Sequence, residues 1–125
     1  IILMLLIPLG SFSQKEVKLK KKYISHYKGI IPPYNMDTGE KTIQVSSTAI
    51  YVEITKDSLF VNIGNNILRG TYYIMFEAKT YYLLEANIDG QLATERIMVY
   101  KRGKHISRDG MYPQPVAELK RYKVR

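Results

Sequence analysis

The sequence contains no cysteine and no tryptophan among its 125 residues. The absence of cysteine excludes disulfide frameworks, thiol nucleophiles, cysteine-ligated zinc, iron–sulfur clusters and a lipid anchor attached through a cysteine. The length excludes a large multidomain enzyme, because single domains cluster around roughly 100–150 residues. Hydrophobic residues make up 46% of the chain and charged residues 24%. This composition excludes a disordered chain, which requires low hydrophobicity together with high net charge.

Charge is absent from the first part of the chain, where residues 1–9 hold eight large apolar side chains and one proline. This run is too short for a spanning helix of about 20 residues, but it fits the apolar region of a secretory signal. Ser11-Phe12-Ser13 supplies the small residues that precede a cleavage site. We therefore expect a signal peptide over residues 1–13 with a truncated start. The mature chain would then be periplasmic or extracellular and would have no transmembrane segment; a buried strand or the end of a membrane anchor is the alternative.

The net charge of +8 is concentrated near the two ends of the chain. Residues 15–22 carry +4, residues 101–110 carry +3 and residues 117–125 carry +3, whereas residues 23–100 carry −2. This distribution predicts a basic N-terminal arm at 14–22 followed by a single β-domain at 23–125. It argues against nucleic acid, whose binders usually spread cations over one face. It leaves contact with an anionic envelope surface, or simply solvated tails, as the interpretations of the basic segments.

The central part of the chain alternates apolar and polar residues with a period of two, which is typical of half-buried strands. We predict five consecutive strands near residues 48–55, 59–63, 68–77, 81–88 and 93–101. Short turns such as Asp89-Gly90 join them, so neighbouring strands must pair antiparallel. Segments 23–31 and 116–122 can add two more strands. The predicted fold class is therefore all-β, an antiparallel meander of five to seven strands that forms a small barrel or curled sheet.

This strand pattern, over roughly residues 23–125, resembles the small lipocalin-like (calycin-like) β-domains that exported bacterial proteins often carry. The leader, which ends in Ser-Phe-Ser before Gln14, resembles the export signals of Gram-negative bacteria. The Gly-x-Trp of the lipocalin family has no counterpart, because the chain has no tryptophan. The resemblance implies a non-catalytic domain that binds a small ligand.

Asp37-Thr38-Gly39 resembles the motif of retropepsin-like aspartic proteases, which need two aspartates close enough to share a proton. The flanking residues read more naturally as a loop with turn chemistry, so the protease remains the enzymatic alternative. His26 and His105 are the only histidines and lack companions at metal-ligand or catalytic spacing. We therefore assign no catalytic residue, no metal and no cofactor.

Tyrosines and one cationic segment provide the candidate ligand-binding residues. Tyrosines on neighbouring strands could form cross-strand aromatic packing or a platform for sugar rings or an apolar ligand. Residues 101–115 are the longest irregular stretch after the sheet begins, and their cations could grip an anionic ligand. The candidate residues are Tyr51, Tyr72, Tyr82, Tyr100, Arg102, Lys104, Arg108 and Tyr112.

The sequence thus predicts an exported, non-catalytic binding or interaction module for a small apolar, glycan or anionic ligand. The alternatives are the aspartic protease through Asp37 and a basic OB-like domain that binds nucleic acid or glycan. A closed barrel, and the residues that line any hollow in it, would discriminate among these functions.

Overall fold

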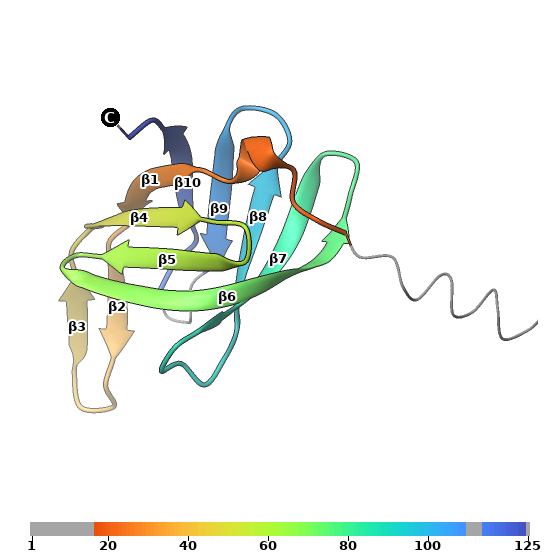
Figure 1. Cartoon of the computed structure of the whole chain (residues 1–125). Helices are drawn as coiled ribbons and strands as arrows, with labels where there is room; N and C mark the ends of the chain where they lie inside the picture. The colour runs from red at the N-terminus through yellow and green to blue at the C-terminus, as the bar shows by residue number, and fades with distance from the viewer. Residues whose placement is uncertain (1–16, 110–113, 125) are drawn as a thin grey trace, which may run out of the picture.

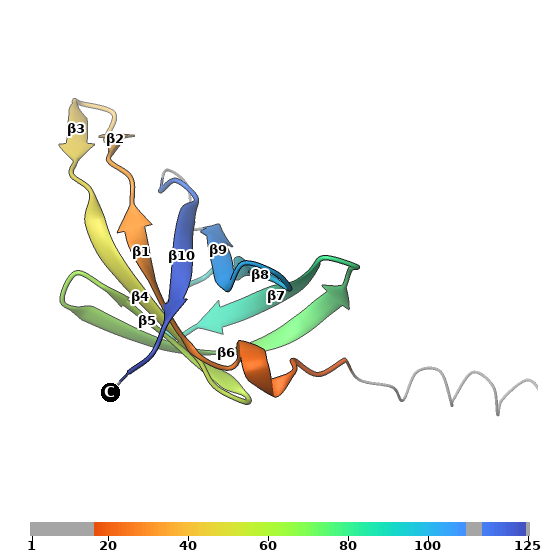
Figure 2. The same ribbon diagram turned by 90° about the horizontal axis from the view of Figure 1, so that it is seen from above.

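The computed structural model describes residues 17–109 and 114–124. Eight antiparallel strands close into a barrel in the order β1-β10-β9-β8-β7-β6-β5-β4, and β4 completes the ring by pairing with β1 (Figure 1). The barrel strands are β1 (His26–Ile31), β4 (Thr48–Ile54), β5 (Ser58–Ile63), β6 (Asn66–Glu77), β7 (Tyr81–Ile88), β8 (Glu95–Tyr100), β9 (His105–Asp109) and β10 (Ala117–Tyr122). A separate hairpin of β2 (Tyr34–Asp37) and β3 (Thr42–Val45) projects from one end of the barrel, as Figure 2 shows from above.

The alternation in the sequence explains which side chains fill the barrel. In β4, Ile50, Val52 and Ile54 are buried inside the barrel, whereas Tyr51 faces outward and is exposed. Successive side chains of a strand point to opposite faces, so a period of two gives one apolar face and one polar face. The same inward alternation in the other strands produces a single core along the barrel axis. The predicted all-β antiparallel meander and its barrel are therefore confirmed.

The five predicted central strands correspond to β4–β8, and the two flanking segments supply β1 and β10. One expectation about an irregular stretch was wrong, and a second was confirmed only in part. Residues 101–115 do not form one long loop, because His105–Asp109 is a barrel strand that pairs with β8 and β10. The stretch around Asp37 is a turn, as expected, but it joins two short strands that pair from Tyr34↔Val45 to Asp37↔Thr42.

β1 closes the barrel because it is hydrogen-bonded on both sides, to β4 and to β10. Gly29 lies opposite Leu119 on one side and Ile50 on the other. A Cβ atom at this position would collide with the backbone carbonyl oxygen of Glu118. The close approach of β1 and β10 therefore depends on a residue without a side chain.

The end of the barrel where β1 begins is closed by aromatic side chains. The 3₁₀ turn η1 (Lys21–Tyr23) places Tyr23 in the core, where its ring contacts that of Tyr82 edge-on at a centroid distance of 5.4 Å. The Tyr27 hydroxyl donates a 2.8 Å hydrogen bond to the backbone carbonyl of Tyr23. The Arg121 guanidinium lies 5.8 Å from the Tyr23 ring centroid and 5.7 Å from that of Tyr27. Burial raises the pKa of Tyr27 and of Tyr82 above the usual tyrosine value.

Candidate aromatic–basic surface on the outside of the barrel

The interior of the barrel is occupied by its own side chains. Tyr27, Ile50, Tyr82, Ile97 and Leu119 all project into it, and each is no more than 1% exposed. Small eight-stranded barrels have interiors just wide enough to be filled in this way. Tyr82, which was predicted as a ligand-binding residue, is therefore a core residue in this structure.

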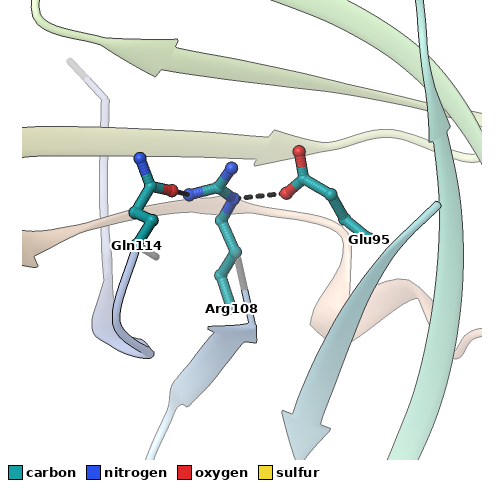
Figure 3. A network of polar contacts seen from close by, with 3 residues as sticks. All are labelled: Glu95, Arg108 and Gln114. Atoms are coloured by element: carbon teal, nitrogen blue, oxygen red, sulfur yellow. Dashed lines mark hydrogen bonds and ion pairs between the residues drawn. The ribbon is translucent and has the colours of Figure 1, made fainter. Parts of the chain in front are cut away.

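A buried ion pair joins the neighbouring strands β8 and β9 inside the barrel (Figure 3). Arg108 of β9 and Glu95 of β8 are 2% and 1% exposed. The Arg108 Nε donates to Glu95 Oε1 at 2.5 Å, and its Nη1 donates to Gln114 Oε1 at 2.6 Å. The expectation that Arg108 belongs to a loop or plain turn was therefore wrong, because it lies in a strand and its charge is used within the barrel.

Of the remaining predicted site residues, only Tyr51 and Tyr100 belong to one surface, which is described below. Tyr51 and Tyr100 lie on the outer face, and Tyr72 points inward at the edge of the core. Arg102 and Lys104 are exposed in the turn between β8 and β9. Tyr112 lies outside the described residues.

Strand pairing instead gathers an aromatic–basic row on the outside of the barrel. Tyr51 lies opposite Lys28, Lys28 lies opposite Lys120, and Lys120 lies opposite His105. The His105 ring stacks on that of Tyr100, with centroids 4.3 Å apart and an interplanar angle of 18°. We call these five residues the outer row; it crosses β4, β1, β10, β9 and β8 in that order.

Lys28 and Lys120 place like charges directly opposite each other in the centre of the outer row. The three ion pairs among the described residues are His26–Glu53, Lys101–Glu77 and Arg108–Glu95, so neither lysine is matched by a carboxylate there. Like charges directly opposite in a sheet are destabilising. The pair is therefore an unneutralised cationic position between aromatic rings.

A hollow of about 470 Å³ adjoins the outer row over β10, β1, β4, β5 and the start of β6. Its lining includes Tyr122, His26, Tyr51 and Phe60. The Tyr51 and Tyr122 rings meet edge-on at 6.3 Å, and the Lys28 ammonium lies 5.0 Å from the Tyr122 centroid. Volumes of 300–1,000 Å³ are typical of small-ligand sites, so the hollow can take one or two small rings.

Asp37 does not reach this surface. It ends β2 in the projecting hairpin, and its Oδ1 accepts a 2.9 Å hydrogen bond from the backbone N–H of Gly39. Gly39 has φ +89°, and the Thr38 hydroxyl bonds to the carbonyl of Lys41. The Asp-Thr-Gly sequence thus performs turn chemistry, as its flanking residues predicted.

No group of three or more potential metal ligands occurs in the described part of the chain. In residues 17–109 and 114–124, no helix is long and apolar enough to cross a membrane. Searches for a matching family model, a matching curated protein and a matching solved structure found none.

Sequence reasoning missed Lys28 and Lys120 of the outer row and Tyr122 of the adjoining hollow, because only β1–β10 pairing brings these residues together. The sequence contains only a weak indication that Lys28 faces outward. Within 23–31, Tyr27 and Ile31 alternate with His26 and Lys28, so a strand there would put Lys28 on the outer face. Nothing local identifies Lys120 as its neighbour.

Proposed function

We propose that this protein is a non-catalytic binding domain that holds an acidic glycan on the outer row and the adjoining hollow. The barrel is compatible with a binding domain and with the lipocalin-like resemblance. The proposal places the ligand outside the barrel, because core side chains occupy its interior. It keeps the expectation of an exported protein, periplasmic or extracellular, where acidic polysaccharides occur.

The observation that carries the proposal is the Lys28–Lys120 pair between Tyr51 and the His105–Tyr100 stack. Two lysines held opposite each other cost stability in the free protein, and a bound carboxylate would remove that cost. Tyr51, which is 42% exposed, offers an aromatic ring to the ring carbons of sugars, and the half-buried His105–Tyr100 stack lies on the other side of the lysines. This combination suits a ligand with both ring faces and anionic groups.

Neighbouring carboxylates favour a glycan over a nucleic acid. Glu53 and Glu118 flank the lysines on the same outer face, and Glu53 is engaged by His26 at 3.4 Å. A strand with a phosphate on every nucleotide would meet these carboxylates as well as the lysines, and such binding depends on neutralising many phosphates. A short acidic oligosaccharide carries only a few carboxylates, so the two lysines can neutralise a large share of its charge.

The test is titration calorimetry of the full chain with an oligogalacturonate, with a malto-oligosaccharide of equal length as the neutral ligand. We expect the acidic ligand to bind and the neutral one to bind at least about tenfold more weakly, a difference of about 1.4 kcal/mol. Lys28→Gln with Lys120→Gln should abolish this preference. Lys41→Gln with Lys79→Gln, two exposed lysines elsewhere, removes the same charge and should leave it unchanged.

The same variants separate binding from folding. Lys28→Gln with Lys120→Gln should be as stable as the unmutated protein or slightly more stable, because the repulsion is relieved. Equal losses of affinity in the two double variants would mean that net charge alone is responsible and would reject the proposal. Tighter binding of a single-stranded oligonucleotide than of the oligogalacturonate would favour the OB-like alternative.

A further inference from the structure

The wall of the barrel contains a notch where β6 parts from β5. These two strands pair from Ile63↔Asn66 to Ser58↔Thr71, and β6 then continues to Glu77 paired with β7. Within the part of the chain that the structure describes, no strand pairs with the other edge of β6 beyond Thr71. The Tyr72 hydroxyl donates to the carbonyl of Thr55 at 2.6 Å, and it lies 3.1 Å from that of Lys56. Tyr72 thereby ties β6 to the β4–β5 turn at the inner end of the notch.

The N-terminal segment forms the opposite side of the notch. It runs past the end of β6 in both views, before η1 (Figures 1 and 2). Leu19 packs against the core, and Tyr23 is buried in it, so this segment is anchored to the barrel. A hollow of about 1040 Å³ lies between it, the β4–β5 turn and residues 72–75 of β6.

The lining of the notch is apolar, with cations around it. Leu19, Ile24, Ile74 and Met75 contribute to the lining, and Met75 is 40% exposed. The charged residues of the lining are Lys18, Lys21, Lys56 and Asp57. None of these three lysines belongs to the ion pairs found among the described residues.

We propose that the notch binds a single anionic amphiphile, with its alkyl chain against Leu19, Ile74 and Met75 and its anionic group near Lys21 and Lys56. An apolar hollow with a few convergent charged groups is the usual form of a small-molecule site. The three lysines outnumber the one carboxylate, so charge complementarity selects an anion. The site is separate from the outer row and does not rest on the glycan proposal.

In the test, the full chain is titrated with octanoate, decanoate and dodecanoate as monomers. Binding is measured by the displacement of a fluorescent apolar anion. Affinity should rise by up to about fourfold for each added methylene, the factor expected when a CH₂ group is buried. Dodecyltrimethylammonium has the same chain with a cationic group, and it should bind at least about tenfold more weakly than dodecanoate. Circular dichroism during the titration confirms that the barrel stays folded.

Two variants and their matched controls locate the site. Lys21→Glu with Lys56→Glu should weaken dodecanoate binding about tenfold or more, whereas Lys41→Glu with Lys79→Glu should not. Met75→Asp should weaken binding, whereas Ile67→Asp, at a 70% exposed position elsewhere on β6, should not. Lys28→Gln with Lys120→Gln should leave dodecanoate binding intact. The proposal is overturned by equal affinity for the cationic amphiphile, by no dependence on chain length, or by equal effects in the controls.

Discussion

Replacing Arg108 by methionine should leave the Glu95 carboxylate inside the barrel without its cation. Both side chains are almost fully buried, so neither charge can recover hydration without disrupting the strands around it. Glu95 Oε2 has no hydrogen-bond partner among the described residues, so Nε of Arg108 is the carboxylate's one hydrogen-bond donor there. Glu95→Leu should be equally destabilising, because it leaves the Arg108 guanidinium buried without its carboxylate partner.

The expected loss is about 3–5 kcal/mol for either single substitution, the cost of leaving one member of a buried pair uncompensated. Domains of this kind are stable by about 5–15 kcal/mol, so each variant should lose a large part of its folding free energy. With a urea m-value near 2 kcal/mol/M, a loss of about 4 kcal/mol moves the unfolding midpoint by about 2 M. The double variant Glu95→Leu with Arg108→Met should recover to within about 1 kcal/mol of the original protein, or exceed it.

Urea unfolding followed by circular dichroism and tyrosine fluorescence provides the assay, since the chain has 11 tyrosines and no tryptophan. Lys101→Met is the control, because it removes the cation of an exposed ion pair, Lys101–Glu77, and should barely move the midpoint. If the single variants each lose less than about 1 kcal/mol and their effects add in the double variant, the pair is hydrated and the reasoning is wrong.

Three further predictions concern the barrel framework. Gly29→Ala should destabilise the protein by about 1–3 kcal/mol in urea unfolding, because the new Cβ meets the carbonyl of Glu118; an unchanged midpoint would mean that β1 and β10 can separate freely. Stability should fall as the pH rises above about 10, because burial raises the pKa of Tyr27 in the folded state and the unfolded chain ionises first. Tyr27→Phe should reduce this alkaline loss, and an identical pH profile would contradict the assignment. Tyr72→Phe should cost about 0.5–1.5 kcal/mol by removing the hydrogen bond to Thr55, and a loss near zero would show that the β4–β5 turn is held by other contacts.

The central strands could be predicted from the sequence because their burial follows the period-two pattern. Ile50, Val52 and Ile54 alternate with exposed or half-buried residues, and each of them is buried as the pattern requires. The turn at Asp89-Gly90 was also predicted from these two neighbouring residues alone, and Gly90 has φ +85°. Information carried by a few neighbouring residues was sufficient for these elements.

β9 could not be predicted in the same way, because its inward alternation contains an arginine. Ile106 and Arg108 face the core. Sequence analysis predicts a charged residue to be solvent-exposed unless its buried partner is known. The partner, Glu95, belongs to another strand and is brought close only by β8–β9 pairing. The projecting hairpin was missed because the turn signals around Asp37 were recognised while the short strands beside them were not.

Tyr51 and Tyr100 of the outer row were among the predicted residues, but its two lysines were beyond sequence reasoning for a related reason. Lys28 and Lys120 lie near opposite ends of the sequence, and the register of β1 on β10 makes them neighbours in the structure. A single sequence contains local patterns but no record of which distant strands pair. The candidate site is therefore a surface that several strands build together, with Tyr51 and Tyr100 as its two predicted members.

The closure of the barrel also determines when the chain can fold. β1 needs β10 as one of its two neighbours, and these are the first and last of the ten strands that the structure describes. During synthesis, β1 must therefore wait unpaired on one side until every other strand has been made, and such long-range pairing is slow to form. The emerging chain should remain without its final structure until then. This delay would suit the proposed export of a chain that has not yet folded, and it would leave strand edges open to aggregation if export failed.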